Sequence, residues 1–215
     1  MIEFFSIENI MATIFGYELS YIEASAILVG ILSAYYSVRN SIWTWYYCII
    51  QGLLFFALFY QVQLYASVII QLFFFGVALY AIWYWKRKDE RVLIKRLDGY
   101  LLAQGIFIVM LAMAIFGHLN SVSHQLFPYL FPVPANYPYA DTFIMSLNII
   151  GVMLLSQRYL EAFACFMLAN IVAIIVCILV GITFTAILYG VLFMIAAAGL
   201  INWIRLYVLQ RARTS

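Results

Sequence analysis

The chain has 215 residues, of which 67% are hydrophobic and only 9% are charged. A soluble domain carries about 25% charged residues, so this excess of apolar surface cannot be hidden in one core and lipid must solvate much of it. The net charge of +2 is too small to suggest a nucleic-acid partner.

Seven segments are apolar enough to cross a bilayer, which requires about 20 predominantly apolar residues each. A short lead-in over residues 1–19 precedes the first of them. The sequence therefore predicts an all-α membrane protein with two three-helix bundles, over residues 20–85 and 140–208, joined by a linker helix over 99–118. The individual spans are expected at residues 20–38, 42–60, 64–85, 99–118, 140–156, 159–180 and 182–208, before a tail over 209–215.

The basic residues test this arrangement, because Lys and Arg collect in short cytoplasmic loops. All eleven fall on one side of the seven predicted spans. They lie after the first span, in a basic loop over residues 86–98, after the fifth span and at the end of the seventh. The amino terminus is therefore expected outside and the carboxyl terminus inside.

The outer connection over residues 119–139 holds every proline of the chain: Pro128, Pro132, Pro134 and Pro138. Proline cannot continue a helix and restricts the residue before it. We therefore expect this connection to be irregular.

A displacement of the chain on itself by 120 residues maps the first three spans onto the last three. It places Trp43 on Phe163 and Tyr46 on Phe166, and it aligns Trp83 with Trp203. Two triplets joined by one extra helix keep the same orientation in the membrane. Parallel repeats of this kind are one known transporter plan, with the ligand site near the midplane between the repeats.

Four amide side chains lie near the middle of predicted spans: Gln51, Gln71, Asn148 and Asn170. An unpaired polar group in hydrocarbon costs about 2–7 kcal/mol, so these amides must face protein, water or a ligand. They either link helices, at about 0.6 kcal/mol on average, or form a site. Their similar depth favours a site for the group as a whole.

Aromatic side chains accompany the amides. Phe163, Phe166 and Asn170 are spaced 0, 3 and 7 and form one helix face, and Tyr47 lies one turn before Gln51. A neutral, aromatic, amide-rich centre suits an uncharged polar ligand or a delocalised cation. The candidate substrate-binding residues are Trp43, Tyr46, Tyr47, Gln51, Gln71, Asn148, Phe163, Phe166 and Asn170.

No ionisable residue is expected at mid-depth, which argues against ion coupling. Asp141 and Tyr137 lie near the outer ends and Glu161 near an inner end, and these three are gate candidates. His118 and His124 have poor spacing for a metal site, and no nucleophile or metalloprotease motif is present. We therefore expect no enzyme activity, no metal and no cofactor.

Four stretches carry a resemblance to a known family. "NSIWTWYY" (residues 40–47), "FYQVQLYASVIIQLFF" (59–74), "YPYADTFIMSLNIIGVMLLSQRYLEAF" (137–163) and "GLINW" (199–203) resemble the PnuC-type vitamin transporters. The resemblance implies seven helices in a plan similar to that of the SWEET proteins, but connected differently. It implies facilitated diffusion of nicotinamide riboside across the bacterial inner membrane, with a periplasmic amino terminus and a cytoplasmic carboxyl terminus. A homo-oligomer, such as a trimer, is also expected.

The chain departs from the family in one motif. The family often shows W-x-x-W at the start of the sixth span, where this chain has Phe163 and Phe166, followed by Asn170. Phenylalanine keeps the aromatic face but lacks the indole N–H. Thiamine therefore stays open as an alternative vitamin, and a seven-helix ligand receptor is a remote alternative, which would bind its ligand without flux.

Overall fold

The computed structural model divides into two compact units, Met1–Val92 and Leu93–Ser215. Pro132, Lys88 and Arg91 of the predicted loops lie outside its described residues. The structure describes residues 6, 9–14, 16–61, 65–87, 93–129, 134, 136–180 and 183–214, without the side chains of 17, 59, 60, 65–70, 180, 183–185, 213 and 214.

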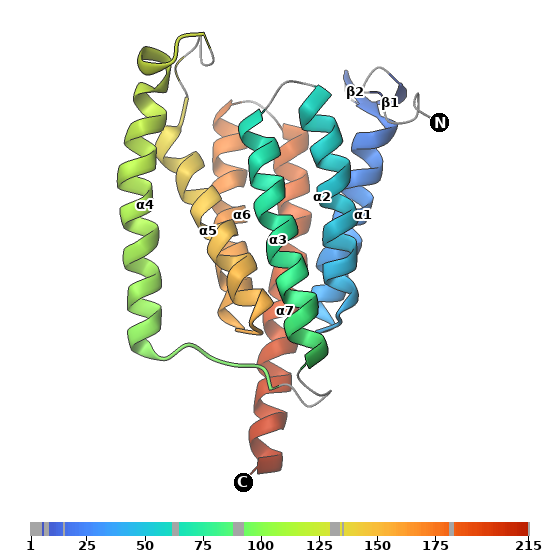
Figure 1. The fold of residues 1–215 in the computed structure, drawn as a ribbon, viewed down its shortest axis with the longest axis vertical. Coiled ribbons are helices and arrows are strands. Elements are labelled where there is room, and N and C mark those ends of the chain that lie inside the picture. The colour runs from blue at the N-terminus through green and yellow to red at the C-terminus, as the bar shows by residue number, and fades with distance from the viewer. Residues whose placement is uncertain are drawn as a thin grey trace. The chain divides into compact units, whose positions relative to one another are not determined.

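The first unit consists of a β-hairpin and three helices. Figure 1 shows the hairpin at one end of α1, and α2 contacts both α1 and α3. The elements are β1 (Ile10–Ile14), β2 (Tyr17–Ser20), α1 (Tyr21–Val38), α2 (Trp43–Gln61) and α3 (Tyr65–Arg87).

The hairpin corrects the expectation of a purely helical chain, because part of the 1–19 lead-in is antiparallel sheet with Ile14 opposite Tyr17. Gly16 between the strands has φ +83°, which glycine adopts without steric cost. Ser20 ends the hairpin and caps α1, since its hydroxyl accepts the Glu23 N–H over 3.3 Å.

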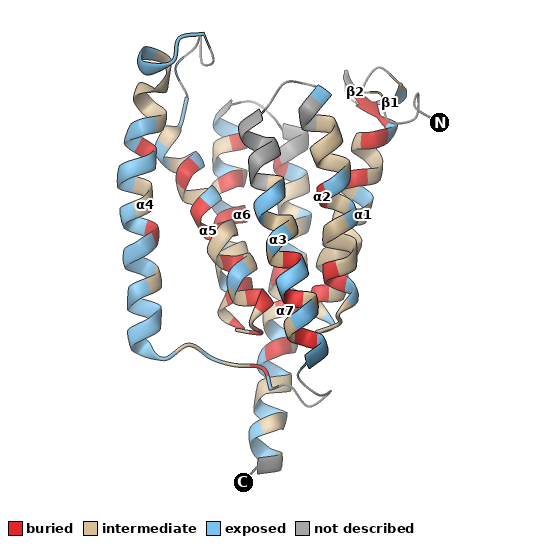
Figure 2. Cartoon of the chain, viewed as in Figure 1, coloured by how far each residue is buried: buried red, intermediate tan, exposed pale blue. Residues whose placement is uncertain are grey.

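The second unit consists of four helices, each of which contacts the next along the chain. Figure 2 shows α4 exposed along most of its length, with Val109 and Gly117 as its buried residues. The elements are α4 (Gly99–Leu126), α5 (Pro138–Ser156), α6 (Glu161–Val180) and α7 (Thr183–Thr214).

Five helices of the described chain, α1, α4, α5, α6 and α7, are long and apolar enough to span a membrane. Two helices run further than the sequence suggested. The fourth span was expected to end at His118, but α4 continues to Leu126. The first proline that could end the helix, Pro128, lies two residues beyond it. The expected tail over residues 209–215 continues α7 as far as Thr214.

The basic loop expected over residues 86–98 is structured at both ends. Lys86 belongs to the last turn of α3. Further along, the backbone of Lys95 donates to the Arg158 carbonyl over 2.9 Å and accepts from the Leu160 N–H over 3.1 Å. The Ile94 side chain is buried. Residues 93–98 are therefore held against the α5–α6 turn.

The α1–α2 turn and the α5–α6 turn share one backbone structure. Asn40 and Arg158, 118 residues apart, both have positive φ, of 51° and 64°. The N–H of Asn40 donates to the Ser37 carbonyl and that of Arg158 to the Leu155 carbonyl, each over 3.0 Å. The same displacement relates the N–H···O bonds Ser41–Tyr36 and Tyr159–Leu154, Thr44–Ser41 and Ala162–Tyr159, and Trp45–Ile42 and Phe163–Leu160.

Side-chain packing follows this displacement as well. Trp45 and Trp85 meet edge to face with ring centroids 5.8 Å apart, and Phe163 and Trp203 do so at 5.1 Å. All four side chains are buried. At these turns and ring pairs the equivalent residues are therefore 118 apart, whereas the sequence comparison used a displacement of 120. Phe163 corresponds to Trp45, whereas the sequence comparison paired it with Trp43.

We expect the Trp45–Trp85 contact to stabilise the first unit. Trp85→Ala should lower the free energy of unfolding by about 3–5 kcal/mol, as large-to-small changes do in soluble cores. Trp83→Ala on the same helix is the matched control, because Trp83 is 49% exposed and its ring lies at the surface beside Arg87 and Tyr80. It should cost about 1 kcal/mol or less. Thermal unfolding in detergent measures both, and equal losses would contradict the assignment.

Candidate functional site

The clearest polar link between helices was not anticipated from sequence. The Thr44 hydroxyl donates to the Ser33 carbonyl over 2.8 Å, and the Ser33 hydroxyl donates to the Thr44 carbonyl over 2.9 Å. Thr44 is buried. Ser33 and Thr44 therefore link α1 to α2 by hydrogen bonds, which is one of the two roles that the sequence suggested for the amides. Their small size next to a turn was the available signal.

Asn170 has a different environment. Its side chain is only 8% exposed, yet it makes no hydrogen bond within the described part of the chain. An amide that linked helices would have a protein partner at this depth. The geometry therefore favours the other explanation, in which the amide of Asn170 is kept for a ligand or water.

The two phenylalanines on the Asn170 face differ in accessibility. Phe163 is 1% exposed and packs on Trp203, and its ring fills the space beside Gly199. Phe166 is half-buried and lies over Gly151, where an added Cβ would come within 2.6 Å of the ring. Phe163 is thus part of the packed core in this conformation, and Phe166 is the ring with exposed surface.

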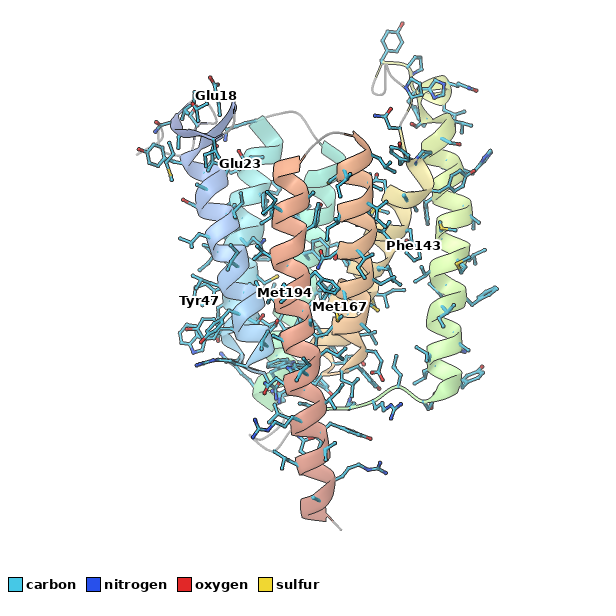
Figure 3. The ribbon with its side chains drawn as sticks, turned by 180° about the vertical axis from the view of Figure 1, so that it is seen from behind. Glu18, Glu23, Tyr47, Phe143, Met167 and Met194 are labelled. Carbon is cyan, nitrogen blue, oxygen red and sulfur yellow. The ribbon has the colours of Figure 1, made fainter. Side chains whose placement is uncertain are left out.

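The predicted aromatic residues of the first unit lie near one end of their helices. Trp43 is the first residue of α2 and is 55% exposed. Tyr47 stacks on Tyr36 at 5.3 Å, and Figure 3 shows Tyr47 at the opposite end of α1 from Glu23. Lys86 lies 5.7 Å from the Tyr46 ring. An aromatic group beside cations at helix ends is typical of a membrane–water interface.

The other amides lie beside glycines or bond to their own helix. The Gln51 amide fills the space beside Gly30, where an added Cβ would be 3.0 Å from Cδ. The Gln71 Oε1 atom lies 4.0 Å from an added Cβ at Gly52. Asn148 Nδ2 donates to the Ile144 carbonyl over 3.0 Å. Within the described residues, Gln51 and Gln71 show no side-chain hydrogen bond.

The gate candidates lie at helix starts. Glu161 begins α6, and its Oε1 atom accepts the Leu97 N–H over 3.0 Å, which ties it to the 93–98 segment. Asp141 is in the first turn of α5, where the helix dipole stabilises a carboxylate. Tyr137 directly precedes α5 and is 39% exposed. The Glu161 contact is an anchor in this conformation.

A cavity of about 310 Å³ lies between α4, α5 and α6. Phe143, labelled in Figure 3, contributes to its wall from α5, together with Val109 and Leu147. Glu161 is its one charged lining residue, and none of the four amides lines it. The apolar lining suits a hydrocarbon group. A polar ligand would need hydrogen-bonding groups that this cavity, apart from Glu161, lacks, so the cavity is not the candidate site formed by the amides.

These features define a multi-pass helical membrane protein in which three of the four amide side chains, those of Gln51, Gln71 and Asn170, have no hydrogen-bond partner among the described residues. Comparison with known families makes the class specific. A family model described as "Nicotinamide mononucleotide transporter" matches residues 20–205. The chain belongs to this family, which is a family of transporters and not of enzymes.

Individual relatives agree with the family. The chain is 26% identical over 225 residues to "Nicotinamide riboside transporter PnuC" of Escherichia coli (strain K12), covering 94% of each chain. The protein of the same name from Shigella flexneri matches to the same extent. A solved structure, "Crystal structure of the Vitamin B3 transporter PnuC", shares the fold with a TM-score of 0.67 at 16% identity, over 88% of this chain and 83% of the other.

The environment of Asn170 gives a stability test that needs no ligand. Asn170→Leu removes an amide that has no hydrogen-bond partner in the described part of the chain, so the midpoint of thermal unfolding in detergent should stay the same or rise. Thr44→Val is the matched control, because it removes a hydrogen bond between helices and should lower the midpoint by an amount equivalent to about 0.6 kcal/mol. A larger loss for Asn170→Leu than for Thr44→Val would show that Asn170 links helices.

Proposed function

We propose that this protein carries nicotinamide riboside across the bacterial inner membrane by facilitated diffusion. The observation that carries the proposal is the buried Asn170 amide, which has no hydrogen-bond partner among the described residues, in a chain of this transporter family. Two relatives carry nicotinamide riboside in their names, while the family description names the mononucleotide. The residues of this chain favour one of the two ligands.

The mononucleotide carries a phosphate, and phosphate sites in proteins rely on Arg and Lys. No Lys or Arg lies within nine residues of any of the four amides in the sequence. Ten residues along a helix correspond to about 15 Å. A phosphate group beside the amides would therefore have no nearby Lys or Arg on the same helices. The riboside carries no phosphate and needs no such partner.

The riboside has three features that these residues can recognise. Its ribose hydroxyls and its carboxamide are hydrogen-bonding groups, which suit Asn170, Gln51, Gln71 and Asn148. Its pyridinium ring is a delocalised cation, which an aromatic face attracts by about 0.5–2 kcal/mol. Phe166 supplies such a face one turn from Asn170, with exposed ring surface. Because Phe163 and Phe166 lack the indole N–H of tryptophan, hydrogen bonding to the ligand is left to the amides.

The mode of transport follows from the absence of charge near the amides. Ion-coupled carriers use ionisable groups within the membrane. Asp141 and Glu161 lie at the starts of α5 and α6, and the Glu161 carboxylate is engaged by the 93–98 segment. We therefore propose a uniporter, with Asp141, Tyr137 and Glu161 near the two mouths of the path.

The arrangement in the membrane belongs to the same proposal. We propose seven spans in two parallel three-helix repeats, with α4 as the linker. The shared turn structure at Asn40 and Arg158 supports the repeat. The basic residues support a periplasmic amino terminus and a cytoplasmic carboxyl terminus. Assembly into a homo-oligomer, such as a trimer, stays a prediction.

Transport by purified protein in proteoliposomes tests the function. Labelled nicotinamide riboside should enter with a saturable rate, and the mononucleotide at equal concentration should not compete. Because no coupling group is expected, collapse of the proton and sodium gradients should leave the initial rate unchanged. Thiamine is offered in parallel. Saturable uptake of thiamine without uptake of the riboside would overturn the substrate, and binding of either without flux would favour a receptor.

Binding by variants adds a residue-level control to this experiment. Asn170→Leu should weaken riboside binding about threefold to tenfold, the effect of losing one hydrogen bond of about 0.5–1.5 kcal/mol. Thr44→Val should bind normally, because its hydroxyl is used between helices. Calorimetry on monodisperse protein measures both. Equal affinities for the two variants would remove Asn170 from the site.

Accessibility of single cysteines tests the orientation. Tyr129 is fully exposed, and Arg96 is exposed on the 93–98 segment. In a background in which Cys48, Cys165 and Cys177 are replaced by Ala, Tyr129→Cys should react with an impermeant thiol reagent on whole cells. Arg96→Cys should react only after permeabilisation. Reversed labelling would contradict the proposed orientation.

A further inference from the structure

The displacement of 118 residues pairs each amide of one unit with a residue of the other. α1 and α5 run without interruption to their turns, and α2 and α6 run without interruption from them. The register set at Asn40 and Arg158 therefore extends along all four helices. Gly30 corresponds to Asn148, and Gln51 corresponds to Ala169.

These two pairs are complementary. In the first unit, the amide of Gln51 on α2 fills the space where a side chain on residue 30 of α1 would begin. In the second unit, Asn148 on α5 has that side chain, and the residue across from it is the small, buried Ala169. Each helix pair thus has one amide and one small residue, with the roles exchanged between the two helices.

Contacts in the second unit support this facing. Phe166 lies over Gly151 in the antiparallel α5–α6 pair. One turn further along both helices, the same antiparallel spacing brings positions 148 and 169 opposite each other. Ala169 is 1% exposed and packs in a cluster with Leu147, the neighbour of Asn148. By this correspondence, the Asn148 side chain begins where the Gln51 amide lies in the first unit, and its Nδ2 atom also donates to the Ile144 carbonyl over 3.0 Å.

A second pair follows part of the same rule. Gly52 on α2 corresponds to Asn170 on α6. Gln71 of α3 reaches toward Gly52, with its Oε1 atom 4.0 Å from an added Cβ. The residue that corresponds to Gln71 is Tyr189, which is not small. The first pair therefore provides the cleaner test.

We propose that ligand recognition depends on an amide at this place in each helix pair, and not on the helix that carries it. Gln51 and Asn148 are then equivalent recognition groups, and Gly30 and Ala169 are specificity-determining because they leave room for them. This inference rests on the proposed function for its ligand. Its geometry can be tested independently of the ligand.

Transfer of the amide between helices tests the proposal. Gln51→Ala should weaken riboside binding about threefold to tenfold, the effect of one lost hydrogen bond. Gly30→Asn combined with Gln51→Ala recreates the arrangement of the second unit and should restore binding to within about twofold of the parent protein. Gly30→Leu with Gln51→Ala is the matched control, which fills the space without an amide and should not restore binding. A folded Gly30→Asn, Gln51→Ala variant that binds no better than Gln51→Ala would overturn the proposal.

A stability cycle separates failure of this inference from failure of the proposed function. Gly30→Asn alone should displace the end of the Gln51 side chain from its place beside residue 30, and the resulting drop in the midpoint of thermal unfolding measures the contacts that the amide loses there. Adding Gln51→Ala should recover most of that loss, so the two changes should be non-additive. If the parent protein binds no riboside while this coupling is found, the ligand is wrong and the geometry stands. Additive effects would overturn the facing of residues 30 and 51.

Discussion

A polar group that leaves water for hydrocarbon costs about 2–7 kcal/mol unless it finds a partner, and the polar side chains of this chain are arranged around that cost. The Thr44 and Ser33 hydroxyls each donate a hydrogen bond to the backbone carbonyl of the other residue. Asn148 donates to the carbonyl one turn back on its own helix. Asn170 is nearly buried and has no such partner within the described residues, and that difference is what the proposed binding role rests on.

Glycine and alanine decide where the larger side chains can lie. Phe163 fills the space beside Gly199, Phe166 that beside Gly151, and the Gln51 amide that beside Gly30. In a bilayer, helices gain little from hiding apolar surface, so close approach at small residues contributes much of the packing. The same small residues therefore set the helix contacts and the positions of the rings and amides. A neutral centre of this kind fits a ligand with hydroxyls, a carboxamide and a delocalised cation.

The sequence determined the helical membrane class, because seven apolar segments separated by short, charged or proline-rich connections admit few alternatives. The helix starts agree with the predicted spans within a few residues, as the hydropathy changes sharply there. Helix ends were predicted less well: α4 runs past His118 because no proline precedes Pro128, and α7 runs past Val208 because no proline or glycine lies between Gly199 and its end at Thr214. The β-hairpin was missed, since its two strands are short and lie in a segment with weak periodicity.

The identity of the four amides was also legible in the sequence, because polar residues within apolar runs stand out. Their environments were not. Only the tertiary structure separated buried Phe163 from half-buried Phe166, placed Trp43 at an exposed helix start, and matched the turns at Asn40 and Arg158 at a displacement of 118 residues. The physical reason is that composition and periodicity report which face of a helix is apolar, whereas the register between two helices depends on how turn geometry and small residues let their backbones approach. That register decides which amide faces which glycine.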